Sequence, residues 1–316
     1  MERSLLPAAG VPSYLVPMAP PTSPRGVALL ALATLRALPL LLWKRPRVAI
    51  ATGGYACVPG AVASWLTRVP VVLVLPDVVP GRAVRALVPL THTIAASTDA
   101  ARHYLPSSKT VVTGYPVREE FLRADRARGR HRFDIPGEAT VLFVAGGSLG
   151  ARSLNAAVAR LLPHLLERHH VIHVTGRDRW EEVTELTVDL PEQLRDRYHP
   201  FPYLDAGDMA DALAASDLAL MRSGASTLGE LPATGTPAVL VPLPLPGVHQ
   251  RENAQFLADQ GAAVVLANDD LDRLGDLLDL LLTDRGRLSG MGQAMRLLFH
   301  PDAAERIADL AREAAG

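Results

Sequence analysis

Short runs of β-branched and other apolar residues alternate along this chain with longer segments whose apolar residues recur at helix spacing. Alternation of this kind, with strands that are apolar at nearly every position, is typical of parallel sheets covered by helices on both faces. The sequence therefore predicts a doubly wound α/β architecture. The predicted strands are residues 48–51, 71–74, 93–96, 110–113, 141–145, 171–174, 218–221, 238–241 and 263–266.

The length of 316 residues favours two domains, because a single domain averages about 150 residues. Charge divides the chain similarly: residues 1–130 carry 16 Lys and Arg against 6 Asp and Glu, which leaves 16 against 27 for residues 131–316. The basic part suits an anionic partner such as a lipid surface, unless it reflects arginine-rich composition alone. We expect domains at 1–125 and 126–316, with an arginine-rich linker at 123–137.

The longest apolar stretch covers residues 27–43, contains Arg36 and Pro39, and precedes a basic cluster at 44–47. A bilayer span needs about 20 apolar residues and tolerates a central arginine poorly, so we do not expect a transmembrane helix. The stretch is predicted as a helix that is either pressed on a membrane surface, with Trp43 at the headgroup level, or packed in a core. Cys57 is the single cysteine, which excludes an internal disulfide and a thiolate zinc cluster.

A glycine-rich turn follows the predicted strand at 141–145 and precedes a predicted helix. It contains Gly147, Ser148 and Gly150, and glycines at such a turn let backbone amides approach an anion at the positive end of the helix. The Ser148 hydroxyl could donate a further hydrogen bond to phosphate. Because the turn is neither a Walker A loop nor the complete dinucleotide fingerprint, it indicates either a phosphate site or a tight turn without ligand.

Two further polar segments follow predicted strands. In residues 222–230, Ser226 and Thr227 are candidate helix caps, and the Glu230 carboxylate could accept two hydrogen bonds from a vicinal diol such as a ribose. Alternatively, Glu230 reaches back to the backbone in a capping box. Residues 242–253 form a proline-rich loop that ends in polar groups. Since ligands of open α/β sheets bind at the carboxyl ends of strands, the three segments predict one crevice with a phosphate end and a sugar or base end.

The second half resembles the donor-binding domain of MurG-type glycosyltransferases in residues 146–155, in residues 222–230, and in His249-Gln250 followed by Asn253. The first half is similar to the same family in residues 52–55, 80–81 and 113–118. The resemblance implies the GT-B fold, with two Rossmann-like doubly wound domains that face each other across a cleft. It also implies an inverting hexosyltransferase of peptidoglycan synthesis. Such an enzyme moves N-acetylglucosamine from UDP-N-acetylglucosamine to undecaprenyl-diphosphate-linked muramoyl pentapeptide, converting lipid I to lipid II.

The resemblance further implies a donor site and an acceptor side. Ser148 would contact the diphosphate, Arg118 and Gln250 would help to hold the donor, and Glu230 would bind the ribose. The implied donor-binding set is Arg118, Gly147, Ser148, Gly150, Ala225, Ser226, Thr227, Leu228, Gly229, Glu230, His249, Gln250 and Asn253. Gly54, Tyr55 and Asp77 would lie on the acceptor side. The muramoyl 4-hydroxyl would attack the anomeric carbon directly while helix-end amides stabilise the charge on the departing UDP.

Two departures from the family affect the catalytic base. The family begins with a strand and a Gly-Gly-Thr-Gly-Gly-His loop that carries the proposed base, whereas residues 6–12 of this chain already match a later family segment. We therefore expect an N-terminal domain that lacks its first βα unit and exposes strand edges and apolar helix faces. Val74-Leu75-Pro76-Asp77 also replaces the His-Glu-Gln-Asn of the family. The catalytic residue stays unassigned, with Asp77 and Tyr55 as candidates.

The remaining predictions concern partners and alternatives. No cofactor is implied, and no metal site is predicted, because Asp270-Leu271-Asp272 begins a helix whose N-terminus favours acidic residues. Nucleic-acid binding is not expected, since aromatic residues make up only 5% of the chain and no binding motif occurs. The basic half predicts a peripheral enzyme on an anionic membrane surface, at the cytoplasmic side of the cell membrane. Two alternatives stay open: a nucleotide-sugar-binding protein with little turnover, or another GT-B enzyme such as a glycolipid glucosyltransferase or a sugar-nucleotide epimerase.

Overall fold

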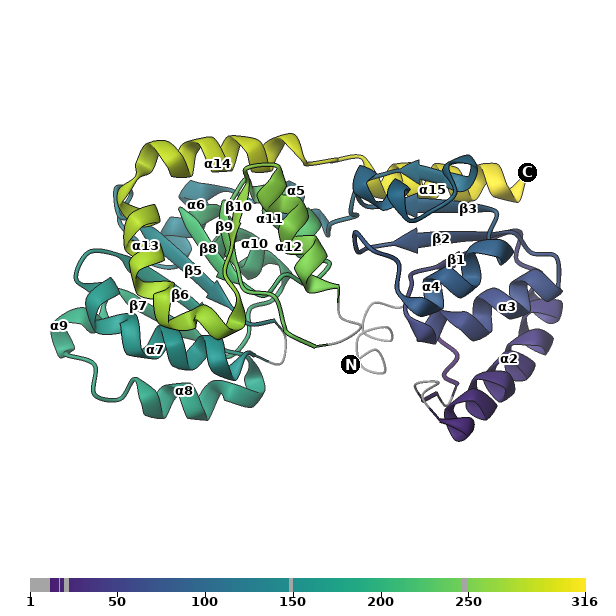
Figure 1. Cartoon of the computed structure of the whole chain (residues 1–316), viewed down its shortest axis with the longest axis horizontal. Coiled ribbons are helices and arrows are strands. Elements are labelled where there is room, and N and C mark those ends of the chain that lie inside the picture. The colour runs from purple at the N-terminus through teal and green to yellow at the C-terminus, as the bar shows by residue number, and fades with distance from the viewer. Residues whose placement is uncertain (1–11, 17, 20–22, 148–149, 246–248) are drawn as a thin grey trace.

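The computed structural model describes residues 12–16, 18–19, 23–147, 150–245 and 249–316. Within these ranges the chain forms two parallel sheets, and each sheet has its own helices (Figure 1). The two sheets lie one after the other along the long axis of the molecule (Figure 1). The residues 6–12 that match a later family segment lie outside the described ranges, apart from Pro12.

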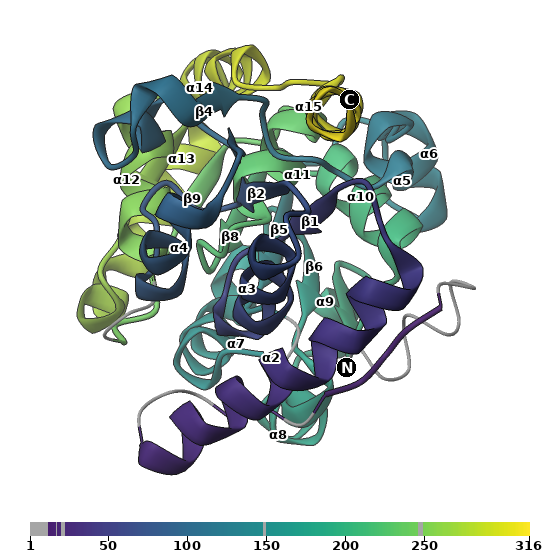
Figure 2. The same cartoon turned by 90° about the vertical axis from the view of Figure 1, so that its right-hand side faces the viewer.

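The first sheet has the strand order β1-β2-β3-β4, and all neighbouring strands are parallel. Its strands are β1 (Ala49–Ala51), β2 (Val71–Leu75), β3 (Thr93–Ala96) and β4 (Thr110–Val112). Its helices are α2 (Pro24–Lys44), α3 (Val58–Leu66) and α4 (Arg82–Leu87), with 3-10 turns at Tyr55–Cys57, Val88–Leu90, Asp99–His103 and Ser107–Lys109. Helix α2 packs against α3 on the outer side of the domain (Figure 2).

The second sheet has the order β10-β9-β8-β5-β6-β7, again all parallel. Its strands are β5 (Val141–Ala145), β6 (His170–Val174), β7 (Tyr198–Phe201), β8 (Leu218–Met221), β9 (Ala238–Leu240) and β10 (Ala263–Val265). Strands β5 and β8 are neighbours although β6 and β7 come between them in the sequence, so the order of the sheet reverses at this pair. This switch point is where doubly wound sheets bind ligands.

Ten α-helices accompany the second sheet within the described residues. They are α5 (Glu119–Leu122), α6 (Arg126–Arg132), α7 (Arg152–Leu166), α8 (Trp180–Leu186), α9 (Glu192–Arg195), α10 (Ala206–Ala215), α11 (Thr227–Thr234), α12 (Gln250–Asp259), α13 (Leu274–Thr283) and α14 (Arg285–Leu297). In β5, Val141 and Phe143 belong to one hydrophobic core and Leu142 and Val144 to another, because successive side chains of a strand point to opposite faces. Both faces of this sheet are therefore covered, and the predicted doubly wound architecture is confirmed.

Each sheet is partly covered by residues from the other part of the chain. Helix α15 (Ala303–Ala315) returns to the first sheet, where Ile307 packs against Val74 and Ala95. In the other direction Val78 and Val79, which follow β2, are buried in a core of the second sheet. The predicted division between residues 125 and 126 falls between α5 and α6, and α15 adds a helix to the first sheet from far beyond that division.

The linker predicted at residues 123–137 is wrong, because part of it forms helix α6, which packs on α10. Arg128 donates from Nε and Nη2 to the two carboxylate oxygens of Asp211, at 2.8 and 2.6 Å. Gly129 lies so close to α10 that a Cβ would stand 2.2 Å from the Asp211 carbonyl oxygen. Arg128 and Gly129 therefore attach α6 to the second domain, so this segment is not a free linker.

The edge of the first sheet is exposed. Strand β1 pairs with β2, and Ile50 in β1 is 51% exposed. Leu35, Leu42 and Trp43 on α2 are exposed as well. Among the described helices, α2 is long and apolar enough to cross a bilayer. The core helices of soluble proteins and signal sequences also meet this criterion. The exposed edge and helix face agree with the prediction for this domain.

Candidate functional site

A cavity of about 530 Å³ lies at the carboxyl ends of β5, β6, β7 and β8. It includes the switch point between β5 and β8, so it occupies the position where ligands of doubly wound sheets bind. Its lining residues are Arg118, Ala145, Gly146, Gly147, Val174, Gly176, Arg177, Asp178, Pro202, Tyr203, Leu204, Met209, Met221, Arg222, Gly224, Ser226, Thr227, Glu230 and Gln250.

The glycine-rich turn after β5 forms one wall of this cavity. A Cβ on Gly146 would stand 2.4 Å from the Ala151 nitrogen, and a Cβ on Gly150, which has a φ of +76°, would stand 2.2 Å from the Thr175 carbonyl oxygen. Gly147 has a φ of +91° and no neighbour on its open side. Ala151 makes no side-chain hydrogen bond to the first amides of α7, so this helix end can receive an anion. Ser148 lies outside the described residues.

Glu230 lies in the first half of α11 and faces the cavity with a side chain that is 15% exposed. Its Oε1 is 3.4 Å from Nη2 of Arg118. Burial raises the pKa of Glu230, while Arg118 and a hydrogen bond with the Ser226 side chain oppose this rise. The capping interpretation is wrong: Ser226 makes no side-chain cap bond, and the Thr227 hydroxyl donates to the Gly224 carbonyl at 2.6 Å.

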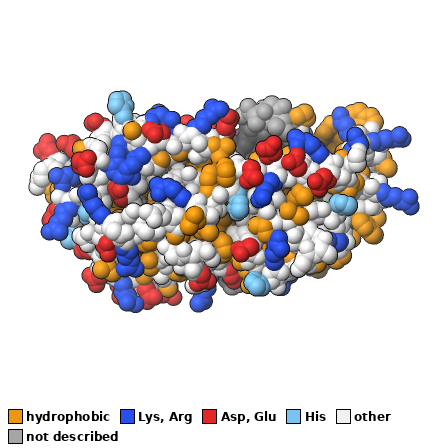
Figure 3. Space-filling model, turned by 90° about the horizontal axis from the view of Figure 1, so that it is seen from above, with side chains coloured by type: hydrophobic (Ala, Val, Ile, Leu, Met, Phe, Trp, Pro, Cys, Tyr) orange, Lys and Arg blue, Asp and Glu red, His pale blue; other side chains and the backbone are white. Residues whose placement is uncertain are grey.

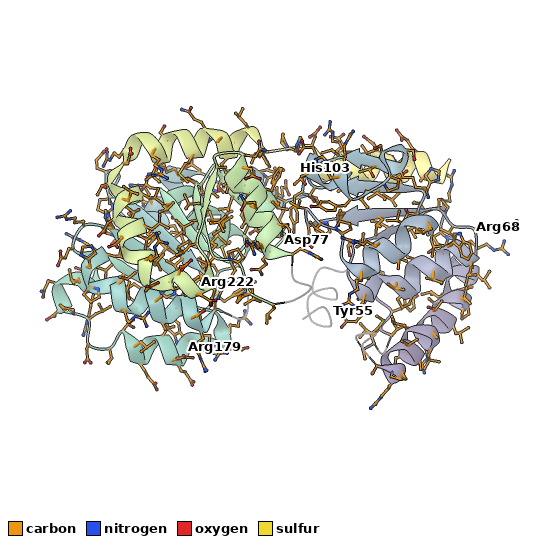
Figure 4. All side chains as sticks on the ribbon, viewed as in Figure 1. Tyr55, Arg68, Asp77, His103, Arg179 and Arg222 are labelled. Atoms are coloured by element: carbon orange, nitrogen blue, oxygen red, sulfur yellow. The ribbon has the colours of Figure 1, made fainter. Side chains whose placement is uncertain are left out.

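Arg222 is buried below the cavity and connects three segments of the second domain. Its Nη1 donates to the Val241 carbonyl at 3.0 Å, and its Nη2 donates to Ser153 Oγ at 2.9 Å and to Asn268 Oδ1 at 2.8 Å. Figure 4 shows Arg222 in the part of the second domain that lies toward the first. The ends of β8 and β9 and the start of α7 are thus fixed relative to one another.

The cavity also has an apolar wall that the sequence analysis missed. It consists of Val174, Tyr203, Leu204, Met209 and Met221. The Arg177 guanidinium lies over the Tyr203 ring, 4.3 Å from its centroid. Tyr203 and Leu204 were missed because β7, the strand before them, contains Pro200, and proline argues against a strand. As an edge strand with β6 as its neighbour, β7 accommodates this residue.

Of the other implied donor residues, Ser226, Thr227 and Gln250 line the cavity, and the rest of those that the structure describes do not. Gln250 lines the cavity, and its Oε1 accepts a hydrogen bond from the Leu243 amide at 3.0 Å. A Cβ on Gly229 would stand 2.4 Å from Cδ1 of Tyr115, so Gly229 allows α11 to approach the segment that joins the sheets. His249 faces Gly81 of the first domain. Ala225, Leu228 and Gly150 are likewise absent from the lining.

Asn253 is fully buried at the domain junction and does not line the cavity. Its Nδ2 donates to Asp77 Oδ1 at 2.8 Å and to the Ser223 carbonyl at 3.2 Å, and its Oδ1 accepts from the Val78 amide at 3.0 Å. Asp77, at the junction in Figure 4, therefore binds the second domain. Tyr55 follows β1 after Gly54 and is 38% exposed.

The acidic pair Asp270 and Asp272 lies in a 3-10 turn, Asn268–Arg273, directly before α13. Negative charge is favourable at this helix end. Across the part of the chain that the structure describes, no group of three or more His, Cys, Asp and Glu side chains is placed to hold a metal ion.

Known proteins share both the sequence and the fold of this chain. Residues 141–307 match the model of the glycosyltransferase family 28 C-terminal domain. A relative from Roseiflexus sp. (strain RS-1) is 40% identical over 98% of this chain and 79% of its own length, and it is named UDP-N-acetylglucosamine--N-acetylmuramyl-(pentapeptide) pyrophosphoryl-undecaprenol N-acetylglucosamine transferase. The chain belongs to the MurG family.

Further members of the MurG family agree. A relative from Desulforudis audaxviator (strain MP104C) with the same name is 33% identical over the whole of this chain and 88% of its own length. The crystal structure of Acinetobacter baumannii MurG superimposes with a TM-score of 0.78 at 27% identity, covering 99% of this chain and 88% of that one. These similarities confirm the predicted GT-B fold and the prediction of a glycosyltransferase.

Proposed function

We propose that this protein moves N-acetylglucosamine from UDP-N-acetylglucosamine to undecaprenyl-diphosphate-linked muramoyl pentapeptide, the lipid I to lipid II step of peptidoglycan synthesis. One observation carries the proposal: six donor residues implied by the resemblance, drawn from separate segments of the chain, line a single cavity. They are Arg118, Gly147, Ser226, Thr227, Glu230 and Gln250. Membership of the MurG family favours this reaction over the reactions of a glycolipid glucosyltransferase or a sugar-nucleotide epimerase.

The parts of UDP-N-acetylglucosamine match the parts of the cavity. The diphosphate binds the backbone amides of the glycine-rich turn, because the start of α7 supplies N–H donors and partial positive charge. The ionised carboxylate of Glu230 accepts hydrogen bonds from the ribose hydroxyls. The flat, apolar wall beside Tyr203 takes the uracil ring, since aromatic and methionine side chains pack well on a planar base.

The proposed chemistry is displacement at the anomeric carbon with inversion, as the muramoyl 4-hydroxyl attacks and UDP leaves. The turn after β5 stabilises the charge that develops on the diphosphate. Binding both substrates between the carboxyl ends of the two sheets supplies orientation. Asp77 is assigned to positioning the junction, because its carboxylate accepts from Asn253. Gly54 and Tyr55 are assigned to the acceptor side, and the general base stays unassigned.

Helix α2 is the proposed contact with an anionic membrane surface at the cytoplasmic side. Leu42 and Trp43 expose apolar surface at its C-terminal end, next to the basic residues Lys44, Arg45 and Arg47. Lys44 Nζ lies 4.3 Å from the centre of the Trp43 ring. Apolar and basic side chains side by side suit the boundary between acyl chains and anionic headgroups. Residues 1–125 are thus assigned to the acceptor and the membrane, apart from Arg118, which lines the donor cavity, and residues 126–316 are assigned to the donor.

The membrane proposal is tested by sedimentation with vesicles that contain or lack anionic lipid. Binding should require anionic lipid and weaken as salt is raised, because screening shortens the reach of the basic cluster. Trp43→Ser should weaken binding, whereas Leu297→Ser, at a residue of α14 that is 86% exposed, should not. Equal binding to neutral vesicles at high salt would reject the electrostatic part.

The donor site is tested with Glu230→Ala, measured by calorimetric titration with UDP. Loss of a charge-assisted, two-point contact should raise the Kd about 10- to 100-fold. Glu185→Ala, at an exposed residue of α8, is the matched control and should leave the Kd unchanged. An unchanged Kd in Glu230→Ala would show that the site is assigned wrongly. UDP binding by the unaltered protein without transfer to lipid I would favour the binding-protein alternative.

The raised pKa of Glu230 gives a second test of the same site. The ribose contact needs the ionised carboxylate, so UDP affinity should fall as the pH drops through a value above that of an ordinary glutamate. Arg118→Ala should move this fall to still higher pH, because Arg118 opposes the rise in pKa. Titrations at a series of pH values measure both effects, and a curve that Arg118→Ala does not shift would contradict the assignment.

A further inference from the structure

A second cavity, of about 460 Å³, lies at the opposite edge of the second sheet, where β5, β8 and β9 begin. Helix α14 covers this edge (Figure 1), and Figure 3, which views the molecule from above, shows Lys and Arg side chains interspersed with acidic side chains over the second domain at the left. Four arginines line the cavity, against two acidic residues. They are Arg126, Arg130, Arg285 and Arg296, with Asp217 and Glu138. Positive charge is therefore in excess around this space.

Asp217 is shared between two of the arginines. Its Oδ1 is 2.5 Å from Nη2 of Arg126, and its Oδ2 is 3.2 Å from Nη2 of Arg130. The same Oδ2 accepts a hydrogen bond from the Val141 amide at 2.8 Å. These contacts hold α6 against the sheet. A single carboxylate serves both guanidinium groups, so it cannot balance the charge of all four arginines.

Arg130 is 5% exposed and sits in the wall of the cavity. Its terminal nitrogens donate to the carbonyl oxygens of Pro136 and Ala139, each at 2.8 Å, while its Nε is buried without a hydrogen-bond partner among the described residues. Burial, and then the nearby Arg126 guanidinium, lower the pKa of Arg130. A buried charge with an unused donor is costly, and an anion in the cavity would reduce that cost.

The face of α14 that borders the cavity begins and ends with an arginine. This face consists of Arg285, Leu288, Ser289, Gly292, Gln293 and Arg296. Eleven residues make about three helical turns, so Arg285 and Arg296 project from the same side of the helix. A helix normally places apolar residues toward its own domain. Here, each end of that face carries a positive charge instead.

Neither Arg285 nor Arg296 has an ion pair among the described residues. Arg285 Nη2 reaches the Glu138 carbonyl oxygen at 3.5 Å. Arg296 lies across Gly235, where a Cβ would stand 2.4 Å from the arginine Nε. The contacts within the fold thus account for Arg126 and for much of Arg130, whereas Arg285 and Arg296 line the cavity with exposed side chains that are open to a ligand.

We infer that this arginine-lined cavity binds a small phosphorylated anion, at a site separate from the donor pocket. Guanidinium groups match pairs of phosphate oxygens in geometry and charge. The volume lies within the usual range for small-molecule sites, roughly 300 to 1,000 Å³. Thr140, Ser289 and Gln293 add polar groups to the lining, which suits a ligand that is polar beyond its phosphate.

Pyrophosphate is the probe, titrated by calorimetry into the full chain with UDP present at the concentration that just saturates the donor pocket. UDP carries a diphosphate of its own, so a larger excess is avoided, and the remaining pyrophosphate signal reports the second site. One site per chain is expected. The double variant Arg285→Ala with Arg296→Ala should weaken pyrophosphate binding about a hundredfold, since two charge-assisted contacts are lost. UDP binding should be unchanged in this variant, which separates the result from that of Glu230→Ala.

The matched control is Arg160→Ala with Arg287→Ala, which removes the same charge from exposed residues of α7 and α14 outside the cavity. It should retain pyrophosphate binding. Equal weakening in both double variants would reveal general charge attraction and overturn the inference, as would the absence of a saturable signal in the unaltered chain. If the alanine pair fails to fold, the single variant Arg296→Gln, which removes the charge and keeps a polar side chain, should weaken binding by about tenfold.

Discussion

The edge strands of the two sheets differ in their exposure to solvent. In the second sheet, every residue of the edge strands β7 and β10 is partly or fully buried. In the first sheet β1 lies at the edge, and Ile50 is half exposed. The second sheet has six strands and the first has four. The second sheet is thus covered by its own segment of chain, whereas the first depends on α15 and on contact at the junction.

This difference shows where stability and function are located. The donor pocket and the arginine-lined cavity both lie on the second sheet, at opposite ends of its strands. The first sheet contributes Asp77 and the segment that carries Arg118. The second sheet thus carries both cavities, and the less covered sheet presents α2 and the proposed acceptor side. Three predictions test this comparison.

The largest expected effect is an acid sensitivity specific to the second sheet. Burial lowers the pKa of His173 to about 3, and burial together with His170 lowers that of His199 to about 4. Below about pH 6.5 the unfolded chain gains protons that the folded chain does not, so stability falls as the pH falls. From pH 7 to pH 5 the second domain should lose about 2 kcal/mol through His173 and somewhat less through the partly exposed His199.

Urea unfolding followed by pulse proteolysis, with the fragments assigned by mass, measures this loss for each domain. His199→Gln should reduce the pH dependence of the second domain, because glutamine does not titrate, and the share that comes from His173 should remain. His103→Gln, at an exposed residue beside β3, is the control and should leave the slope of the second domain as it is. A second domain that is equally stable at both pH values would contradict the prediction.

A middle-sized effect is expected from the helix that the first sheet receives from the end of the described chain. Ile307→Ala removes a side chain that is 8% exposed and packs against Val74 and Ala95. It should lower the free energy of unfolding of the first domain by about 2 to 3 kcal/mol. Leu297→Ala, at a residue that is 86% exposed, should change it by less than about 0.5 kcal/mol. If the two variants match, α15 does not stabilise the first sheet.

The smallest effect is expected at the exposed strand edge. Ile50→Lys should change the free energy of unfolding by no more than about 0.5 kcal/mol, because the side chain is already half in water. The added charge should also reduce self-association, since edge lysines discourage strand pairing between molecules. Light scattering and urea unfolding measure the two effects. A large loss of stability would mean that Ile50 is buried in solution and that the edge of the first sheet is covered as well as the edges of the second.

Much of the fold could be predicted because the strands are apolar at nearly every position. Val71 to Leu75 and Val141 to Ala145 are strands that no polar residue interrupts, and both sheets follow from such runs. Strand β7 was missed because Pro200 breaks the pattern. The destination of α15 could not be predicted, because a helical pattern shows which face is apolar but not which sheet it covers.

The residues of the candidate site, too, could be predicted only in part. Glu230 and Gly147 follow strands in recognisable local patterns, so they could be assigned to the cavity they line. Asn253 was assigned to the donor, yet its side chain is hydrogen-bonded to Asp77, Val78 and Ser223. Local patterns report which strand end a residue follows. They do not report contacts between residues 175 or more positions apart, which arise only when the two domains meet.

The packing of α15 also sets an order of events during synthesis. The residues that form and cover the second sheet, 119–297, leave the ribosome before residues 303–315 do. Until those last residues emerge, the face of the first sheet that carries Val74 and Ala95 lacks its covering helix. Domains generally fold in the order in which they are made. Here the domain that is translated first is completed last, so one apolar face of its sheet stays uncovered while the second domain folds behind it.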